Sequence, residues 1–218
     1  MNKAVELITK WGAFDARHPE SSIEDFCRHY LSEKAAAAKG GQQSEWQTNV
    51  SVDFALMRMM GRIYKLHSFY ASKAMEGTDI SSSEEFSLLN AIDGLGEPRK
   101  KDAITRALFE QSTGSDMLNR LKKIGYISES PDAEDGRSRR IKITAKGYKA
   151  LKICRRSMEQ LAGMQFHDLS ADEKKICLQL LSGIDRKYSS LWQSHKDKSF
   201  EDIYETVIQD SAGNKKSD

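Results

Sequence analysis

The stretch STGSDMLNRLKKIGYISESPDAEDGRSRRIKITAKG, residues 112–147, decides the fold that the sequence predicts. Its first third has the pattern of a helix, because apolar residues recur at spacings of three and four and define one buried stripe: Met117, Leu118, Leu121 and Ile124. The opposite face is polar. Gly125 is expected to end this helix, since glycine readily adopts a positive φ.

Two short strands are predicted after the helix. Tyr126 and Ile127 alternate with polar residues, and Ile141 and Ile143 do the same after a charged connection at residues 131–138. This alternation indicates a two-stranded hairpin with one buried face. Thr144 is placed to cap the helix that follows.

The combined pattern resembles the winged helix-turn-helix of MarR-type transcriptional regulators. A helix ending in LxxxG, a hairpin tip with D-x-R, and the sequence IxITxKG carry the resemblance, at Leu121, Gly125, Asp135, Arg137, Ile141, Ile143, Thr144, Lys146 and Gly147. Helical patterns on either side extend it from about residue 45 to residue 192. The resemblance implies a mainly α fold with a small β-hairpin wing, in which a winged helix-turn-helix is joined to a helical dimerisation domain.

Double-stranded DNA is the partner that the resemblance implies. Short hydroxyl and amide side chains at the start of a helix can reach base edges and phosphates in a major groove. From the recognition helix, the preceding helix and the wing, the residues expected at DNA are Ser112, Thr113, Ser115, Asp116, Asn119 and Arg120; Arg99 and Lys100; and Asp135, Arg137 and Arg139. The resemblance implies that Arg137, and secondarily Arg139, enters the minor groove, with Asp135 orienting Arg137.

Two residues of the recognition helix depart from the family pattern. Gly114 stands where an apolar residue is usual, and a glycine inside a helix weakens it. Asp116 places a negative charge where a cation is common at a DNA-facing position. Its carboxylate could accept from a cytosine amino group, or it could cap the helix start.

The distribution of charge is more informative than its total. The formal net charge is +2, but residues 99–149 contain 13 Lys and Arg against 7 Asp and Glu, a local charge of +6. A basic segment that coincides with the predicted winged helix suits a phosphate-facing surface. A merely solvated charged face is the alternative.

Cys27, Cys154 and Cys177 are odd in number and widely separated, so neither a disulfide framework nor a structural zinc is expected. Cys154 and Cys177 fall on apolar stripes, which predicts buried and unreactive thiols. No signal peptide and no apolar run of about 20 residues is visible, which predicts a cytoplasmic protein without a membrane partner.

The order of helical patterns predicts five segments. Residues 1–44 form N-terminal helices of unassigned role, residues 45–80 a long helix contributing to dimerisation, and residues 81–147 the DNA-binding domain. Residues 148–195 form a helical dimerisation region, and residues 196–218 a tail with one short helix. Ser21 or Ser22 is expected to cap the second N-terminal helix. Capping boxes are expected at Ser21–Glu24, Ser82–Glu85 and Ser170–Glu173, and Pro98 is expected in the first turn of a helix.

These features predict a homodimeric regulator that binds a near-palindromic operator and responds to a small-molecule effector at an unassigned site. A winged helix used for protein contacts, or a cysteine-based redox sensor, are the alternatives. No phosphate loop, dinucleotide-binding motif or catalytic constellation is present in the sequence, so neither enzymatic activity nor a cofactor is expected.

Overall fold

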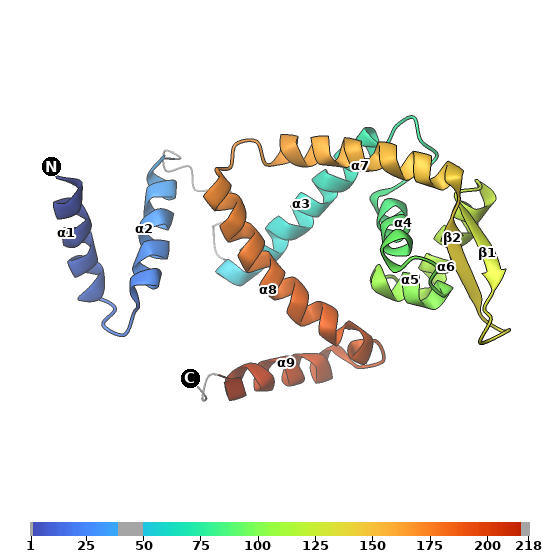
Figure 1. Cartoon of the computed structure of the whole chain (residues 1–218). Coiled ribbons are helices and arrows are strands. Elements are labelled where there is room, and N and C mark those ends of the chain that lie inside the picture. Colours follow the sequence, from blue (N-terminus) through green and yellow to red (C-terminus); the bar gives the residue numbers. More distant parts are fainter. Residues whose placement is uncertain (1, 39–49, 215–218) are drawn as a thin grey trace. The chain divides into compact units, whose positions relative to one another are not determined.

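A computed structural model describes residues 2–38 and 50–214 of the chain (Figure 1). The chain divides into two compact units, residues 1–62 and 63–218, and the division falls within helix α3 (Val52–Ala74). The predicted fold class is confirmed, since helices dominate and the only sheet of the described residues is a two-stranded hairpin.

The first unit contains a helical hairpin of α1 (Lys3–Asp15) and α2 (Ile23–Ala38). Aromatic contacts hold the hairpin together. The rings of Trp11 and Phe26 pack edge to face with their centroids 5.1 Å apart, and the ring centroids of Phe14 and Phe26 are 5.6 Å apart. Ser22 precedes α2, and its hydroxyl and backbone N–H both donate to the carboxylate of Asp25. The cap is therefore Ser22, one of the two serines expected there, whereas the predicted Ser21–Glu24 capping box was wrong because the partner of Ser22 is Asp25.

The winged helix-turn-helix consists of α4 (Ser83–Leu95), α5 (Lys100–Arg106), α6 (Gln111–Lys123), β1 (Ile127–Pro131) and β2 (Arg139–Ile143). The strands are antiparallel, with Ile127 opposite Ile143. The predicted apolar stripes are confirmed, because Leu118 and Leu121 of α6 and Tyr126, Ile127, Ile141 and Ile143 of the hairpin are all buried in one core. Gly125 ends the α6 turn with φ +78°.

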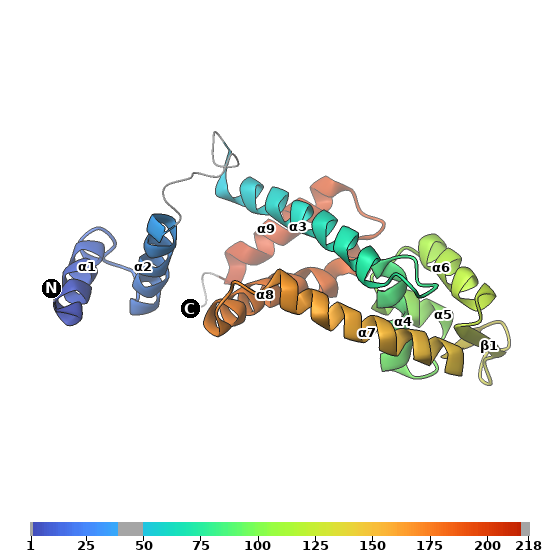
Figure 2. The ribbon, with the colours of Figure 1, turned by 90° about the horizontal axis from the view of Figure 1, so that it is seen from above.

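Three further helices follow the wing: α7 (Ala145–Gln165), α8 (Ala171–His195) and α9 (Phe200–Asn214). Thr144 caps α7 through its hydroxyl, which accepts from the N–H of Gly147, and Ser170 forms the predicted capping box with Glu173. In Figure 2, the part of α3 that belongs to the second unit, residues 63–74, and α7 both lead to the winged helix. Ala71 and Met75 at the end of the α3 segment join the same core as α7, through which the winged helix is fixed to both helices.

Several local predictions differ from the structure. Pro98 precedes α5 instead of lying in its first turn, and its carbonyl accepts from the N–H of Ile141, so the chain is extended there and bridges β2. Cys154 is buried as predicted, and burial raises the pKa of its thiol. Cys177 is exposed on α8, so its predicted burial was wrong for a single chain. The predicted start of the long helix, at residues 45–49, lies outside the described residues.

Candidate nucleic-acid interface

The outer face of α6 carries the polar residues that the sequence placed at DNA. Ser112, Thr113, Asp116 and Asn119 are exposed, and Ser115 is half-buried. Glu110 precedes the helix, and its side chain makes no capping hydrogen bond, so in the described structure no side-chain cap covers the first-turn N–H groups. Free N–H groups at a helix start are suited to binding a phosphate oxygen.

Gly114 sets the distance between α5 and α6. It is buried, and a Cβ built on it would lie 2.6 Å from Cγ2 and 2.7 Å from Cγ1 of Ile104 in α5. No other residue fits without moving Ile104, which is itself buried. The glycine that departs from the family pattern therefore allows a close contact between the two helices, a role that the sequence reasoning missed.

A buried carboxylate organises the base of the wing. The side chain of Asp132 is inaccessible to solvent, accepts a hydrogen bond from Nε of Arg99 at 2.8 Å, and forms an ion pair with Arg140, whose Nε lies 3.0 Å away. Its second oxygen accepts from the backbone N–H groups of Glu134 and Asp135. The bond from Arg99, the backbone N–H groups and the nearby Arg140 together hold the pKa of the Asp132 carboxyl well below its usual range.

At the wing tip, Asp135 orders the backbone. Its carboxylate accepts from the N–H of Arg137 at 3.0 Å and from the hydroxyl of Ser138 at 2.8 Å. The predicted orientation of Arg137 by Asp135 thus acts through the main chain and not through the guanidinium. Within the described part of the chain, the exposed side chains of Arg137 and Arg139 form no ion pair with the protein.

Three of the cations predicted at DNA form ion pairs with acidic side chains of the protein. Arg99 holds Asp132 and also contacts Glu134, while Lys100 pairs with Glu129 at 2.5 Å. Arg120 donates to the buried carboxylate of Glu85 at 3.1 Å and to the carbonyl of Asp79 at 2.7 Å, which ties α6 to the start of α4.

These contacts span 29 to 41 residues of sequence, so no local pattern could have indicated them. The structure thus separates the predicted set into an exposed group and a group that holds the domain together. The residues that the sequence reasoning missed are Asp132 and Arg140. Asp132 has a weak local signal, because an aspartate in a loop often accepts from the backbone N–H two residues later, as Asp132 does from Glu134. Arg140 has no such signal in the sequence.

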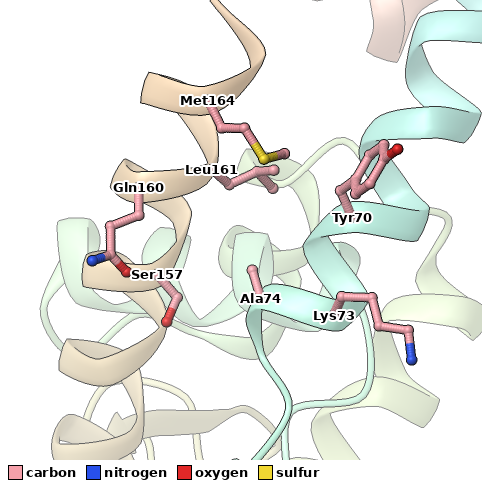
Figure 3. Close-up of a pocket in the computed structure, with 7 residues that line it drawn as sticks. All are labelled: Tyr70, Lys73, Ala74, Ser157, Gln160, Leu161 and Met164. Atoms are coloured by element: carbon pink, nitrogen blue, oxygen red, sulfur yellow. The ribbon is translucent and has the colours of Figure 1, made fainter. Parts of the chain in front are cut away.

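A cavity of about 390 Å³ lies between α3 and α7, outside the DNA-facing region (Figure 3). Its lining is mostly apolar, and Figure 3 shows Leu161 and Met164 of α7 extending toward the α3 side, where Tyr70 stands. The full lining is Tyr70, Lys73, Ala74, Ser157, Gln160, Leu161 and Met164. Cavities of this size can enclose a small aromatic molecule. No effector site could be located from the sequence, because the lining is brought together from two helices about 90 residues apart.

The described residues contain no cluster of His, Cys, Asp and Glu side chains that could hold a metal ion. None of the described helices is long and apolar enough to span a membrane.

Comparison with known proteins supports the assignment of the fold. Residues 82–147 match the family of winged helix DNA-binding domains. No curated protein sequence matches the chain. Among solved structures, the organohalide-sensing transcriptional regulator RdhR-CbdbA1625 bound to 2,4-dichlorophenol has a TM-score of 0.62 at 19% identity, covering 71% of this chain and 89% of its own.

Two further structures are similar in the same way. The PcaV regulator from Streptomyces coelicolor, in complex with its natural ligand, has a TM-score of 0.55 at 19% identity and covers 63% of this chain and 96% of its own. A cysteine variant of MarR from E. coli, in complex with operator DNA, has a TM-score of 0.56 at 20% identity and covers 59% of this chain and 92% of its own. The predicted resemblance to MarR-type regulators is thereby confirmed in the fold.

Proposed function

We propose that the protein is a sequence-specific double-stranded DNA-binding transcriptional regulator that acts as a homodimer on a near-palindromic operator. The observation that carries the proposal is the combination of an exposed polar face on α6 with a wing whose tip arginines project from an internally paired base. Within the winged helix, Asp132 holds Arg99 and Arg140 and Glu85 holds Arg120, which leaves the arginines of the wing tip for phosphates. A wing used for protein contacts would not require that division.

Dimerisation is supported by the large apolar area that a single chain leaves uncovered. In α3 and α8, the aliphatic and aromatic side chains that are about half exposed or more include Leu56, Met57, Ile63, Phe69, Leu178, Leu180 and Leu181. Exposed apolar areas of this extent mark an interface. A symmetric dimer would bury them and would present two α6 helices to successive major grooves, about 34 Å apart.

The decisive experiment is the selection of bound sequences from random duplex DNA. A near-palindrome with half-sites about one helical turn apart is expected. On the selected operator, Arg137→Ala is expected to weaken binding by about 1–3 kcal/mol without unfolding the protein. Arg140→Ala serves as the contrast, since it should reduce the stability of the wing as well as affinity. Selection that yields no sequence would refute specific DNA binding.

The α3–α7 cavity is the candidate effector site. Its apolar walls, with the polar side chains of Ser157 and Gln160 at one side, suit a small aromatic compound that carries a hydroxyl or carboxylate. Solved regulators of this fold bind such molecules, as the 2,4-dichlorophenol complex illustrates. The hydroxyl of Tyr64 in α3 donates to the carboxylate of Glu84 in α4, so a shift of α3 would be transmitted to the winged helix.

A panel of phenols and hydroxybenzoates, screened by thermal unfolding, would test this site. A ligand at about 100 times its Kd is expected to stabilise the folded state by about 2.7 kcal/mol. Ala74→Phe fills the cavity and should abolish that stabilisation while leaving operator binding intact. Ser72→Phe adds the same ring on the exposed side of α3 and should leave the response unchanged. An unchanged ligand response in the Ala74 variant would place the effector elsewhere.

A further inference from the structure

The α1–α2 hairpin buries little of its apolar surface. Of its described residues, only Phe14 and Phe26 are buried, at 6% and 4% exposure. Five aliphatic side chains remain about half exposed or more: Val5, Leu7, Ile8, Ile23 and Leu31. A hairpin of this length has too small a core to be stable by itself, so it requires a partner surface.

Three of these side chains, Leu7, Ile8 and Ile23, line a groove on the hairpin. The groove encloses about 280 Å³ and is lined by Leu7, Ile8, Trp11, Ile23, Phe26 and Cys27, none of which is charged. Residues 2–38 contain 5 Lys and Arg and 6 Asp and Glu, a net charge of −1. A nucleic acid or an anionic membrane surface would require a basic face, so neither fits this groove.

The walls of the groove include the two most exposed aliphatic side chains of the hairpin. Ile8 and Ile23 line the groove and are the most exposed aliphatic residues of the hairpin, at 70% and 65%. A surface with an apolar hollow beside apolar projections is complementary to a second copy of itself about a twofold axis. We propose that the α1–α2 hairpins of two chains pair groove to groove, forming a four-helix bundle at the amino-terminal end of the dimer.

This inference rests on the proposed homodimer, for a quantitative reason. Covering the exposed aliphatic side chains and the edge of Trp11 removes roughly 400 Å² of apolar area per hairpin, or about 800 Å² for the pair, which is below the size of an independent specific interface. Two hairpins already tethered within one dimer meet at a high effective concentration, and a contact of this size is then sufficient. Thirteen residues separate Ala38 from Val52, a length that spans up to about 45 Å.

Cys27 gives a direct test because it lines the groove and is exposed. In a full-length Cys177→Ser variant it is the accessible thiol, since Cys154 is buried. A bismaleimide with a reach of about 10 Å, a distance comparable to the separation of packed helices, is expected to join Cys27 of the two chains in most dimers. Ile8→Glu, which places a charge in the groove, should reduce the cross-linking rate at least tenfold, whereas Thr9→Glu, which places it on the next residue outside the groove lining, should leave the rate unchanged.

Sedimentation of the same samples separates the two proposals. Dimers that fail to cross-link through Cys27, or that cross-link equally with Glu at residue 8 and at residue 9, would overturn hairpin pairing and leave the regulator proposal intact. A cross-link from Cys27 to a Tyr204→Cys thiol in place of the symmetric one would also overturn it, because α9 would then occupy the groove. A monomer at micromolar concentration would instead refute the homodimer itself.

Discussion

Replacing Gly114 by alanine tests the closeness of the α5–α6 contact. In an ordinary helix, Gly→Ala stabilises by about 1 kcal/mol. Here the added Cβ would lie 2.6, 2.7 and 3.1 Å from three atoms of Ile104, whereas carbon atoms in contact prefer about 3.5–4.0 Å. The helices must separate by roughly 1 Å, since Ile104 is buried and β-branched and offers no flexible end that could move aside.

The balance between the gain in helix propensity and the cost of overpacking decides whether Gly114→Ala stabilises or destabilises the protein. Overpacking of a well-packed core costs about 1–3 kcal/mol, and three atoms inside the normal contact distance place this site at the upper end. We therefore expect Gly114→Ala to lower the free energy of unfolding by about 1–2 kcal/mol after the helix-propensity gain. Operator affinity should fall further, because α6 is displaced from the wing.

Urea unfolding followed by circular dichroism measures the effect, with Gly94→Ala as the matched control. Gly94 lies in α4 of the same domain, and a Cβ built there meets no atom within 4 Å, so its replacement should leave stability unchanged or raise it by up to about 1 kcal/mol. Ile104→Ala should be less costly in the Gly114→Ala background than in the original chain. If Gly114→Ala were as stabilising as Gly94→Ala, the close-contact explanation would be refuted.

Three further predictions concern single residues. Leu108 adopts φ +58° in the turn between α5 and α6, with 44% of its surface exposed. Leu108→Gly should therefore relieve backbone strain and raise the free energy of unfolding by about 0.5–1 kcal/mol in the same urea assay. A lower free energy of unfolding would contradict the strain. Arg120→Met leaves the Glu85 carboxylate buried without its cation, and should cost about 1–2 kcal/mol, less than a fully buried pair because Arg120 is 40% exposed; thermal unfolding with Arg106→Met as the exposed control checks it. The pKa of Asp132 is depressed mainly by Arg99, so this carboxylate contributes stability that is present above the unfolded pKa of about 3.9 and is lost as the pH falls through the folded pKa. The difference in unfolding midpoint between the original chain and Asp132→Asn should therefore be full at pH 6 and shrink below about pH 3.5. A difference independent of pH would show that the charge of Asp132 does not cause the stabilisation.

The features predictable from the sequence are those with a local cause. Leu118 and Leu121 share a helix face, and the φ of +78° at Gly125 and the cap by Thr144 each depend on a few neighbouring residues. The winged helix could therefore be recognised from 36 residues. The exposed polar face of α6 followed from the same periodicity, because the buried stripe fixes which side chains point outward.

What escaped prediction depends on contacts between distant segments. Arg99 and Asp132 meet because Pro98 bridges to β2, a pairing that neither helical nor strand periodicity contains. The necessity of Gly114 depends on Ile104 standing opposite, so the sequence alone showed only an unfavourable helix residue. Cys177 was expected to be buried because its stripe is apolar, and a single chain leaves that stripe open.

The ion pairs of the winged helix also limit how strongly salt can weaken DNA binding. Of the 13 cations in residues 99–149, seven pair with acidic side chains: Arg99, Lys100, Arg120, Lys122, Arg140, Lys142 and Lys146. Six remain without an ion pair among the described residues, all of them exposed: Lys101, Arg106, Lys123, Arg137, Arg139 and Lys149. Each phosphate neutralised contributes about −0.9 to the slope of log affinity against log salt, so twelve such cations in the proposed dimer set a limit near −11.

That limit makes the internal pairing testable by binding alone. A slope between about −4 and −11 on the selected operator is expected if the exposed cations contact phosphates and the paired ones stay with their carboxylates. Replacing Arg137 and Arg139 together should reduce the slope by up to about 4 in the dimer, whereas Lys142→Ala, which removes a paired cation, should leave it nearly unchanged. A slope steeper than about −11 would require further cations to contact phosphates, either the paired ones of the winged helix or some of those outside residues 99–149. A steep slope that falls on Arg140→Ala would show that the wing base around Asp132 rearranges when DNA binds.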